Sequence, residues 1–300
     1  MKSSLSLLGL GDLFIEIHLP ENLPLLSEKR FMPFQTNASA SDICWEYHII
    51  AVGSQTSTTP DQQINLHQAR VNRLGDGNAI LRMPQVQKRL EQARDHTEWL
   101  TIEMHPGAVT VLDFKENRAD MFISQEFATE LGNHGIGPAM LALFMPHFSA
   151  MLLHASALVR NNRTAIFLAP DEGGKTTAAL LASSGTILSD DQVLVRQTHV
   201  GFQASGTPWG LYCNSKLQAP LSGLFLLEKS GHFALNPLPP KELSRYLWEE
   251  HKNQLAILPP PLQTKARKII VAISNSAPTW KLSFAKDAID WEAIDKAMAG

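Results

Sequence analysis

The sequence predicts a mixed α/β protein, with a β-rich N-terminal domain over residues 1–125 and an α/β core over residues 126–300. Alternation of apolar and polar residues, typical of strands, dominates the first part. In the second part, a glycine-rich loop stands between an apolar strand and a helical run of small residues. The 300 residues are 44% hydrophobic and 18% charged, which is the composition of an ordinary globular protein with a sizeable core.

The N-terminal domain shows five segments with strand patterns and no catalytic constellation. The expected strands are 14–19, 43–52, 99–104, 108–113 and 119–123. Polar, turn-rich loops are expected at 36–42 and 53–65. The histidines of this domain lack the spacing of metal ligands; they are His18, His48, His67, His96 and His105. We therefore assign the domain an accessory or recognition role.

The C-terminal domain alternates strands and helices. Helical periodicity is expected over 125–148, with a break at 135–138. A helix is expected from 177 to 184, ended by Gly185 as its C-cap. The other expected helices are 239–250, 262–274 and 287–298, and the expected strands are 151–159, 164–169, 186–191, 192–197, 201–205, 222–228, 233–235 and 280–284.

The glycine-rich loop fits the phosphate-binding pattern G-x-x-x-x-G-K-[ST] except at its first position, where Ala169 replaces glycine. Glycines let backbone N–H groups approach phosphate oxygens. Lys175 is expected to reach the β- and γ-phosphates, and the Thr176 hydroxyl to join the shell of a magnesium ion. A glycine turn that merely opens an ordinary helix is the structural alternative. The expected nucleotide-binding residues are Ala169, Pro170, Asp171, Glu172, Gly173, Gly174, Lys175, Thr176 and Thr177.

Two features of the loop itself are expected from its residue types. Ala169 should keep a negative φ as the last strand residue, because positive φ is unfavourable for a residue with a Cβ. Asp171 and Glu172 should face solvent, since both would add negative charge near a polyanion.

Asp190 and Asp191 end the short strand that follows the expected helix. One carboxylate would hold magnesium and the other would take or orient the proton of an attacking hydroxyl, in an order left open. An acidic turn with aspartate as a local cap is the structural alternative. The expected metal ligands are Thr176, Asp190 and Asp191.

Three features in order resemble the HPr kinase/phosphorylase family and its related serine kinases, and more distantly the nucleotide site of ATP-dependent phosphoenolpyruvate carboxykinase. They are His154 on the strand before the loop, the loop over 169–176, and the pair Asp190 and Asp191. The run 206–209, Gly-Thr-Pro-Trp, is similar to the related kinases, and the resemblance covers residues 153–227. It implies a kinase core with this P-loop, in which His154 lies near the phosphate or the acceptor.

The expected function is ATP- and magnesium-dependent transfer of a γ-phosphoryl group to a hydroxyl of a small molecule, peptide or protein, with a serine hydroxyl as the expected type. The expected catalytic residues are His154, Lys175, Asp190 and Asp191. HPr itself is not the expected acceptor, because the long glycine- and arginine-containing HPr-kinase signature and a recognisable HPr-kinase N-domain are missing. The altered first glycine motivates an alternative, a non-catalytic nucleotide-binding module that regulates or scaffolds a partner. A carboxykinase is weaker, since no arginine set for a dicarboxylate is identified.

Composition excludes several other classes. The net charge of −3 does not favour nucleic acid or an anionic membrane as a partner. Cys44 and Cys213 are too few and too far apart for a disulfide framework or a zinc site. No apolar span is long enough for a membrane helix, and Asp12 interrupts the short N-terminal apolar run, so a cytoplasmic protein is expected. Homo-oligomerisation is left open.

Overall fold

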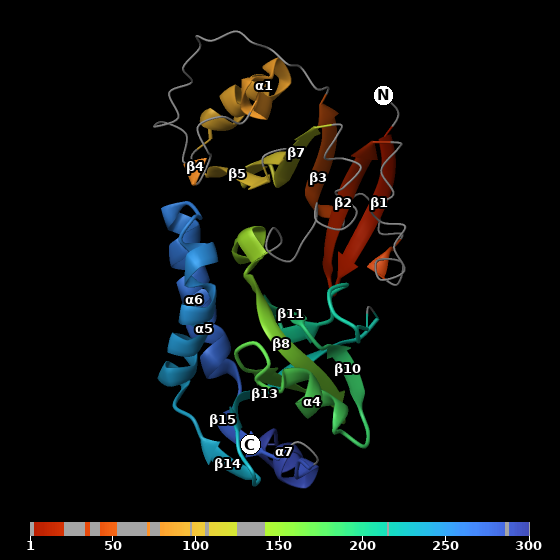
Figure 1. The fold of residues 1–300 in the computed structure, drawn as a ribbon, viewed down its shortest axis with the longest axis vertical. Helices are drawn as coiled ribbons and strands as arrows, with labels where there is room; N and C mark the ends of the chain where they lie inside the picture. Colours follow the sequence, from red (N-terminus) through yellow and green to blue (C-terminus); the bar gives the residue numbers. More distant parts are fainter. Residues whose placement is uncertain are drawn as a thin grey trace. The chain divides into compact units, whose positions relative to one another are not determined.

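The computed structural model describes residues 3–20, 34–36, 43–52, 71–72, 79–96, 98–105, 108–124, 142–214, 216–285 and 288–299. They form a mixed α/β protein with two mixed sheets, which confirms the predicted class at this level. The chain divides into two compact units, one mainly from residues 1–137 and one mainly from 138–300 (Figure 1). The predicted loop 53–65, residues 37–42 of the predicted loop 36–42, and residues 125–141 of the predicted helical stretch 125–148 lie outside the described residues.

The N-terminal unit contains a seven-stranded sheet with the order β1-β2-β3-β7-β6-β5-β4. Strands β2, β3 and β7 are parallel neighbours, whereas β7, β6 and β5 are antiparallel. All five predicted strands are present, and the apolar run at the N-terminus adds β1. The bounds are β1 Ser3–Leu10, β2 Leu13–Pro20, β3 Ile43–Val52, β4 Val71–Asn72, β5 Trp99–His105, β6 Ala108–Asp113 and β7 Arg118–Ser124.

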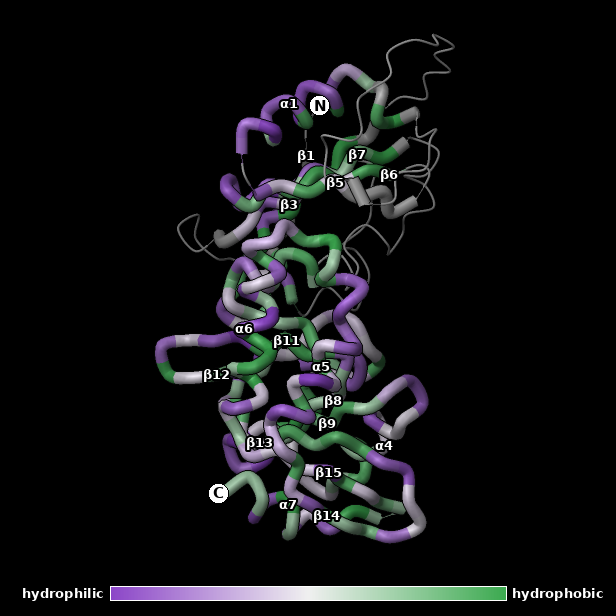
Figure 2. Tube along the Cα trace, turned by 90° about the vertical axis from the view of Figure 1, so that its left-hand side faces the viewer, coloured by the Kyte–Doolittle hydropathy of each residue, from purple (hydrophilic) through white to green (hydrophobic). Residues whose placement is uncertain are grey.

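One helix of this unit, α1 (Pro84–Arg94), was not predicted from the sequence. Most of its residues are hydrophilic (Figure 2). A narrow stripe of Val86, Leu90 and Ala93 is buried against residues of the sheet such as Val109 and Phe122. This stripe has helical spacing but too few apolar residues to stand out, which explains why the pattern was missed. The short 3-10 helix η3, Ala79–Arg82, precedes it.

The C-terminal unit contains eight strands, of which β8 and β13 are the longest. β8 pairs with β11 through its first half and with β9 and β10 through its second half. β9 also pairs in parallel with β13, which pairs in parallel with β15. The bounds are β8 Ala150–Arg160, β9 Arg163–Leu168, β10 Thr186–Ser189, β11 Gln192–Thr198, β12 Gly201–Ser205, β13 Gln218–Lys229, β14 Ala234–Pro237 and β15 Thr279–Phe284.

The helices of this unit follow the predicted pattern with one correction. They are η4 Met145–Phe148, α4 Lys175–Leu180, α5 Pro240–Leu255, α6 Pro260–Ser276 and α7 Trp291–Ala297. The prediction that the helix after the loop continues to 184 and is capped by Gly185 was wrong, because α4 ends at Leu180. Gly185 instead has a φ of +119° just before β10, where a Cβ would lie only 2.8 Å from the Val159 carbonyl oxygen.

The core of the C-terminal unit lies around β9 and β13. Phe167 of β9 contacts Phe225 of β13 and Trp291 of α7, with ring centroids 5.5 and 5.9 Å apart. The Trp291 indole donates a hydrogen bond to the Leu181 carbonyl oxygen at 3.1 Å, so α7 is tied to the end of α4. In the described part of the chain, no helix combines the length and the hydropathy needed to cross a membrane.

Candidate functional site

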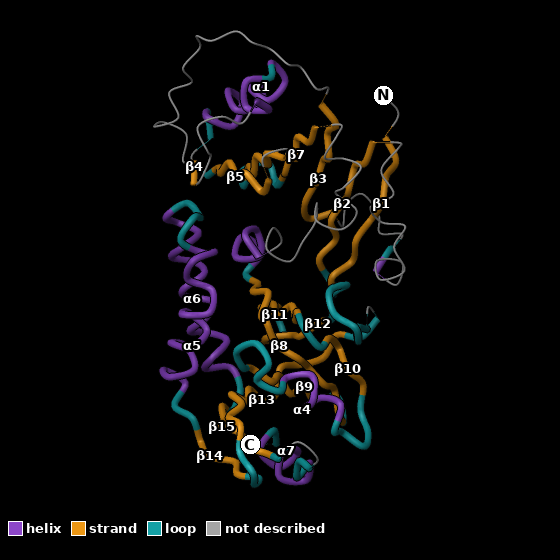
Figure 3. The backbone as a smooth tube through the Cα atoms, in the orientation of Figure 1, coloured by secondary structure: helices purple, strands orange, loops and turns teal. Residues whose placement is uncertain are grey.

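The glycine-rich loop lies where three parallel strands end. β9 ends at Leu168, and α4 begins at Lys175 beside β8 and β9 (Figure 3). Parallel strands of α/β sheets bind ligands outside their carboxyl ends. A cavity of about 560 Å³ lies here, of a size that suits a small-molecule ligand. Its lining comes from the loop, from α4 and from the ends of β13 and β15: Glu172, Gly173, Gly174, Thr177, Lys229, Ser230 and Phe284.

The backbone of the loop explains its two glycines. Gly174, the N-cap of α4, has a φ of +95°, which favours glycine. A Cβ on Gly173 would overlap the Cβ of Ala169 and lie 2.8 Å from the Pro170 carbonyl oxygen. Ala169 is buried in the core cluster and does not belong to the described residues with positive φ, as predicted. Gly173 therefore supplies the close approach between the two arms of the loop.

Lys175 is held inside the loop. Its residue is 7% exposed, and its Nζ donates hydrogen bonds to the carbonyl oxygens of Ala169 at 3.0 Å and Pro170 at 3.2 Å. Burial lowers the pKa of Lys175, and the nearby Asp171 carboxylate opposes that shift. On the next residue, the Thr176 hydroxyl donates to the Asp190 carbonyl oxygen at 3.3 Å. The loop and the aspartate pair are therefore in direct contact.

The structure brings His154 together with three carboxylates. His154 Nε2 lies 3.3 Å from Asp191 Oδ1 and 3.4 Å from Asp171 Oδ1, and its Nδ1 lies 3.5 Å from Glu250 Oε1. The hydrogen bond to Asp191 raises the pKa of His154, although burial and Lys175 oppose the shift. The side chains of Asp171 and Asp191 are 90% and 45% exposed, so both remain open to a ligand. Asp171 and Glu172 face solvent as predicted.

The two neighbouring aspartates face different surroundings. Asp190 is 6% exposed, and its Oδ1 accepts a hydrogen bond from the Tyr212 backbone N–H at 3.0 Å. Gly210, with a φ of +133°, packs against that carboxylate. Asp191 contacts His154 instead. The carboxylate of Asp190 thus holds the 210–212 loop, whereas that of Asp191 is available beside the glycine-rich loop.

Sequence reasoning missed the residues that α5 adds to this site. A second cavity, of about 270 Å³, borders His154 and is lined by Ala142, Leu152, His154, Gln192, Glu250, His251 and Gln254. His251 is 7% exposed, and its Nε2 has no hydrogen-bond partner among the described residues. Polar residues recur every four positions along α5, at Tyr246, Glu250 and Gln254. This spacing was the sequence signal that could have indicated a polar face on the helix.

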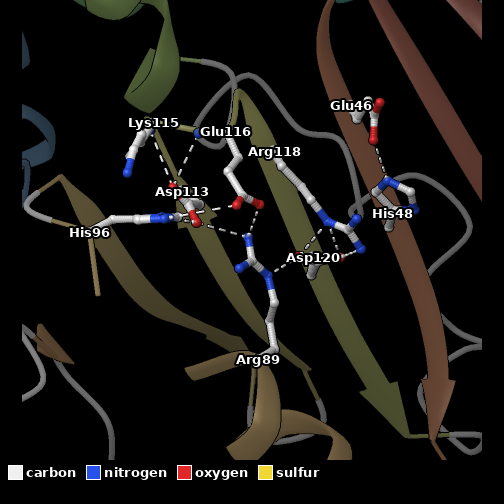
Figure 4. Close-up of polar contacts among 9 residues, drawn as sticks. All are labelled: Glu46, His48, Arg89, His96, Asp113, Lys115, Glu116, Arg118 and Asp120. Atoms are coloured by element: carbon white, nitrogen blue, oxygen red, sulfur yellow. Dashed lines mark hydrogen bonds and ion pairs between the residues drawn. The ribbon is translucent and has the colours of Figure 1, made fainter. Parts of the chain in front are cut away.

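The N-terminal unit has its own polar cluster, also missed from the sequence (Figure 4). Arg89 of α1 lies between Asp113 of β6 and Asp120 of β7, with Nη2 at 3.2 Å from Asp113 Oδ2. His96 Nδ1 lies 2.8 Å from the same Asp113 oxygen, and Arg118 Nη2 lies 2.6 Å from Asp120 Oδ1. These side chains pair with one another and join the helix to the sheet.

Two histidines of this unit come together across neighbouring strands. His18 of β2 and His48 of β3 are register partners, and their rings stack with centroids 4.1 Å apart. Ligand-type atoms of His18, Glu46 and His48 lie within 4.8 Å of one another, as do those of His96, Asp113 and Glu116. Burial lowers the pKa of His48. His67 lies outside the described residues.

Comparisons with protein-family models and with curated proteins find no match for the chain. The resemblance of residues 153–227 to HPr kinases therefore stays a prediction from three ordered motifs. The functional assignment depends on the geometry of the site.

Proposed function

We propose that the C-terminal unit binds ATP with magnesium and transfers the γ-phosphoryl group to a hydroxyl of a small molecule, peptide or protein. The observation that carries the proposal is that the expected catalytic and metal-binding residues contact one another around the glycine-rich loop. His154 touches Asp191 and Asp171, while Thr176, which follows Lys175, touches the aspartate pair through the Asp190 carbonyl oxygen. Acidic, basic and hydroxyl groups thus meet at the carboxyl end of β9.

The nucleotide half of the proposal has support from the loop and its cavity. Gly173 and Gly174 line the cavity of about 560 Å³ and leave the loop backbone unobstructed by side chains. Lys175 can exchange its two bonds to loop carbonyl oxygens for bonds to phosphate oxygens, and a phosphate would also restore the charge that burial disfavours. Lys229 and Phe284 offer a cation and a ring surface farther along the same cavity.

The residues present fit magnesium. The Thr176 hydroxyl and the Asp190 carbonyl oxygen lie 3.3 Å apart, and these two oxygens would hold the ion. Hydroxyl, carbonyl and carboxylate oxygens are the hard ligands that magnesium prefers. When bound with the nucleotide, magnesium supplies charge neutralisation to the phosphates.

The transfer half of the proposal assigns the base role to Asp191. In the proposed step the acceptor hydroxyl oxygen attacks the γ-phosphorus, the bond to the bridging oxygen breaks, ADP leaves, and Asp191 takes the hydroxyl proton. His154 orients Asp191 through their 3.3 Å contact. Asp190 supports the site through the 210–212 loop and its backbone carbonyl.

One observation favours the alternative of a nucleotide-binding module without transfer. Lys175 Nζ is satisfied by the loop's own carbonyl oxygens, and Ala169, which replaces the usual first glycine, is part of the packed core. Such a loop can bind phosphate without promoting chemistry. Transfer activity therefore separates the two functions.

Lys175→Ala and Asp191→Asn, measured side by side, test the proposal. We expect Lys175→Ala to lower ATP affinity at least tenfold, equivalent to about 1.4 kcal/mol, because it removes the charge facing the phosphates. Asp191→Asn should bind magnesium-ATP within a few-fold of wild type but lose transfer by about 10²-fold or more, the scale of general base catalysis. Calorimetric titration and a coupled assay of ADP formation measure the two effects.

Lys296→Ala is the matched control, because Lys296 is 75% exposed and pairs with Glu292 on α7. It should leave both quantities unchanged. Unchanged ATP affinity in folded Lys175→Ala would overturn the nucleotide assignment. Near-normal transfer in both Asp190→Asn and Asp191→Asn would overturn the catalytic one, and a wild type that binds ATP but transfers to no acceptor would favour the binding module.

A further inference from the structure

We propose that the cavity between α5 and the sheet, beside His154, binds a small amino alcohol, a compound with one hydroxyl and one cationic amine. This inference deepens the proposed function, on which it rests, by naming the class of acceptor. Three observations carry it: the size of the cavity, a buried histidine whose Nε2 has no hydrogen-bond partner among the residues described, and the sign of the charge that lines the cavity.

The cavity is built by two strands and one helix. Leu152 and His154 are two residues apart on β8 and therefore share one face of the strand. Gln192 of β11 is the register partner of His154. Glu250, His251 and Gln254 come from adjacent turns of α5, so that they share one side of the helix. The volume of about 270 Å³ lies just below the range of pockets for drug-sized ligands and suits a metabolite of a few heavy atoms.

His251 indicates that the cavity has a polar occupant. The residue is 7% exposed, it lines the cavity, and its Nε2 has no hydrogen-bond partner in the part of the chain that the structure describes. Buried polar atoms are nearly always hydrogen-bonded, so an unpaired one requires an explanation. A ligand hydroxyl or amine supplies that partner, since a neutral imidazole offers both a donor and an acceptor.

The charges favour a cation. Among the described residues of the lining, Glu250 carries the only carboxylate, and none is a lysine or arginine. Asp171 and Asp191 add negative charge on the other side of His154. An ammonium group can therefore pair with Glu250, whereas a ligand carboxylate would find no fixed positive partner among these described lining residues.

His154 connects this cavity to the phosphoryl-transfer site. Its Nδ1 lies 3.5 Å from Glu250 Oε1, and its Nε2 lies 3.3 Å from Asp191 Oδ1. A ligand whose amine pairs with Glu250 can extend its hydroxyl along the imidazole toward Asp191. The transfer step balances as above: an O–P bond forms at the hydroxyl, the γ-phosphorus–bridging oxygen bond breaks, and Asp191 takes the proton.

The test measures binding in the absence of nucleotide, with probes of matched size and different charge. The probes are 2-aminoethanol, 1,2-ethanediol, glycolate and L-serine, titrated against the full chain and followed by NMR. We expect 2-aminoethanol to bind at least tenfold more tightly than 1,2-ethanediol, and glycolate to bind most weakly. L-serine should bind more weakly than 2-aminoethanol, because its carboxylate lacks a partner.

Glu250→Gln and Glu249→Gln form a matched pair of variants. Glu249 directly precedes Glu250 on α5, but its Oε2 lies 2.6 Å from Lys252 Nζ and the residue does not line the cavity. Glu250→Gln should abolish the preference for the amine, and Glu249→Gln should retain it. Equal affinity for the amine and the diol, or an unchanged preference in Glu250→Gln, would overturn the proposal.

The failure of this inference and that of the proposed function are distinguishable. Lys175→Ala should retain the amine preference while it loses ATP affinity, because Lys175 does not line this cavity. Amine selectivity without any transfer from ATP would overturn the kinase activity alone. Transfer to an acceptor without amine selectivity would overturn the amino-alcohol assignment alone.

Discussion

In the N-terminal unit, Arg89 lies between Asp113 and Asp120, and all three side chains are at most 8% exposed. In the C-terminal unit, His251 is as deeply buried, yet its Nε2 has no hydrogen-bond partner within the described chain. The neighbouring carboxylates of Asp171 and Asp191 remain open to solvent. Both clusters contain polar groups at the contact of a helix with a sheet. They differ in whether those groups satisfy one another.

The difference separates a framework from a binding site. A buried charge that is fully paired stabilises one arrangement of helix and sheet, and it has no capacity left for a ligand. A buried polar atom without a partner costs stability in the free protein, and the cost is recovered when a ligand binds. On this basis we assign the Arg89 cluster to the framework and the cluster around His154 to function.

The largest expected effect concerns stability and tests whether the Arg89 cluster holds the N-terminal unit together. Arg89→Ala leaves the carboxylates of Asp113 and Asp120 buried with less compensation, although His96 and Arg118 remain near them. We expect it to lower the free energy of unfolding by about 3–5 kcal/mol, the range for breaking a buried ion pair. Urea unfolding followed by circular dichroism measures the change.

Arg94→Ala, at the exposed end of the same helix, is the control and should change stability by less than about 0.5 kcal/mol. A loss in Arg89→Ala no larger than that of the control would show that the cluster does not stabilise the unit. The Arg89 cluster could then no longer be contrasted, as a structural cluster, with the cluster around His154.

The next effect concerns the pH dependence of stability at His251. Burial lowers the pKa of His251 from its ordinary value of 6.5 to about 4. As the pH falls from 6.5 to 4, the unfolded chain binds a proton at this position and the folded chain does not, so stability is lost. The loss approaches about 3 kcal/mol below pH 4, at 1.36 kcal/mol per pKa unit.

His251→Gln should remove this contribution and flatten the fall of unfolding free energy between pH 6.5 and pH 4. The exposed His199→Gln serves as the control and should keep the wild-type dependence. Chemical denaturation at a series of pH values measures the three curves. Parallel curves for His251→Gln and wild type would mean that His251 is protonated in the fold, contrary to the burial that we describe.

Local pattern was sufficient for most strands and for the loop. Alternation over 43–52 and the spacing of Gly174, Lys175 and Thr176 are encoded within a few residues, and the described strands and α4 follow them. The pattern overextended α4 to 184, because small polar residues can continue a helix or end it. Packing decided that Gly185 leads into β10.

The site residues from distant segments could not be found in this way. Glu250 and His251 lie on α5, and Glu250 is 96 positions along the chain from His154. Only the tertiary fold brings them together. The sequence also treats Asp190 and Asp191 as an equivalent pair. Both aspartates lie in the bend between β10 and β11, where one carboxylate reaches the Tyr212 N–H and the other reaches His154.

The smallest expected effect tests whether the glycine-rich loop binds nucleotide although alanine stands at its first position. Ala169 is 1% exposed in the core cluster, and its φ is not positive, so alanine causes no backbone strain there. Ala169→Gly should therefore change ATP affinity by less than about threefold, below 1 kcal/mol by the affinity relation. It should lower the free energy of unfolding by about 0.5–1 kcal/mol, because glycine gains more freedom on unfolding.

The two readouts distinguish a working loop from a degenerate one. If alanine at this position had impaired the loop, restoring glycine would raise ATP affinity tenfold or more. The loop of the present protein would then be one that has lost its affinity for nucleotide. If affinity stays constant while stability falls slightly, Ala169 acts only through its packing against Gly173 and the core. The methyl group then belongs to the framework, and the glycines, Lys175 and Asp191 carry the function.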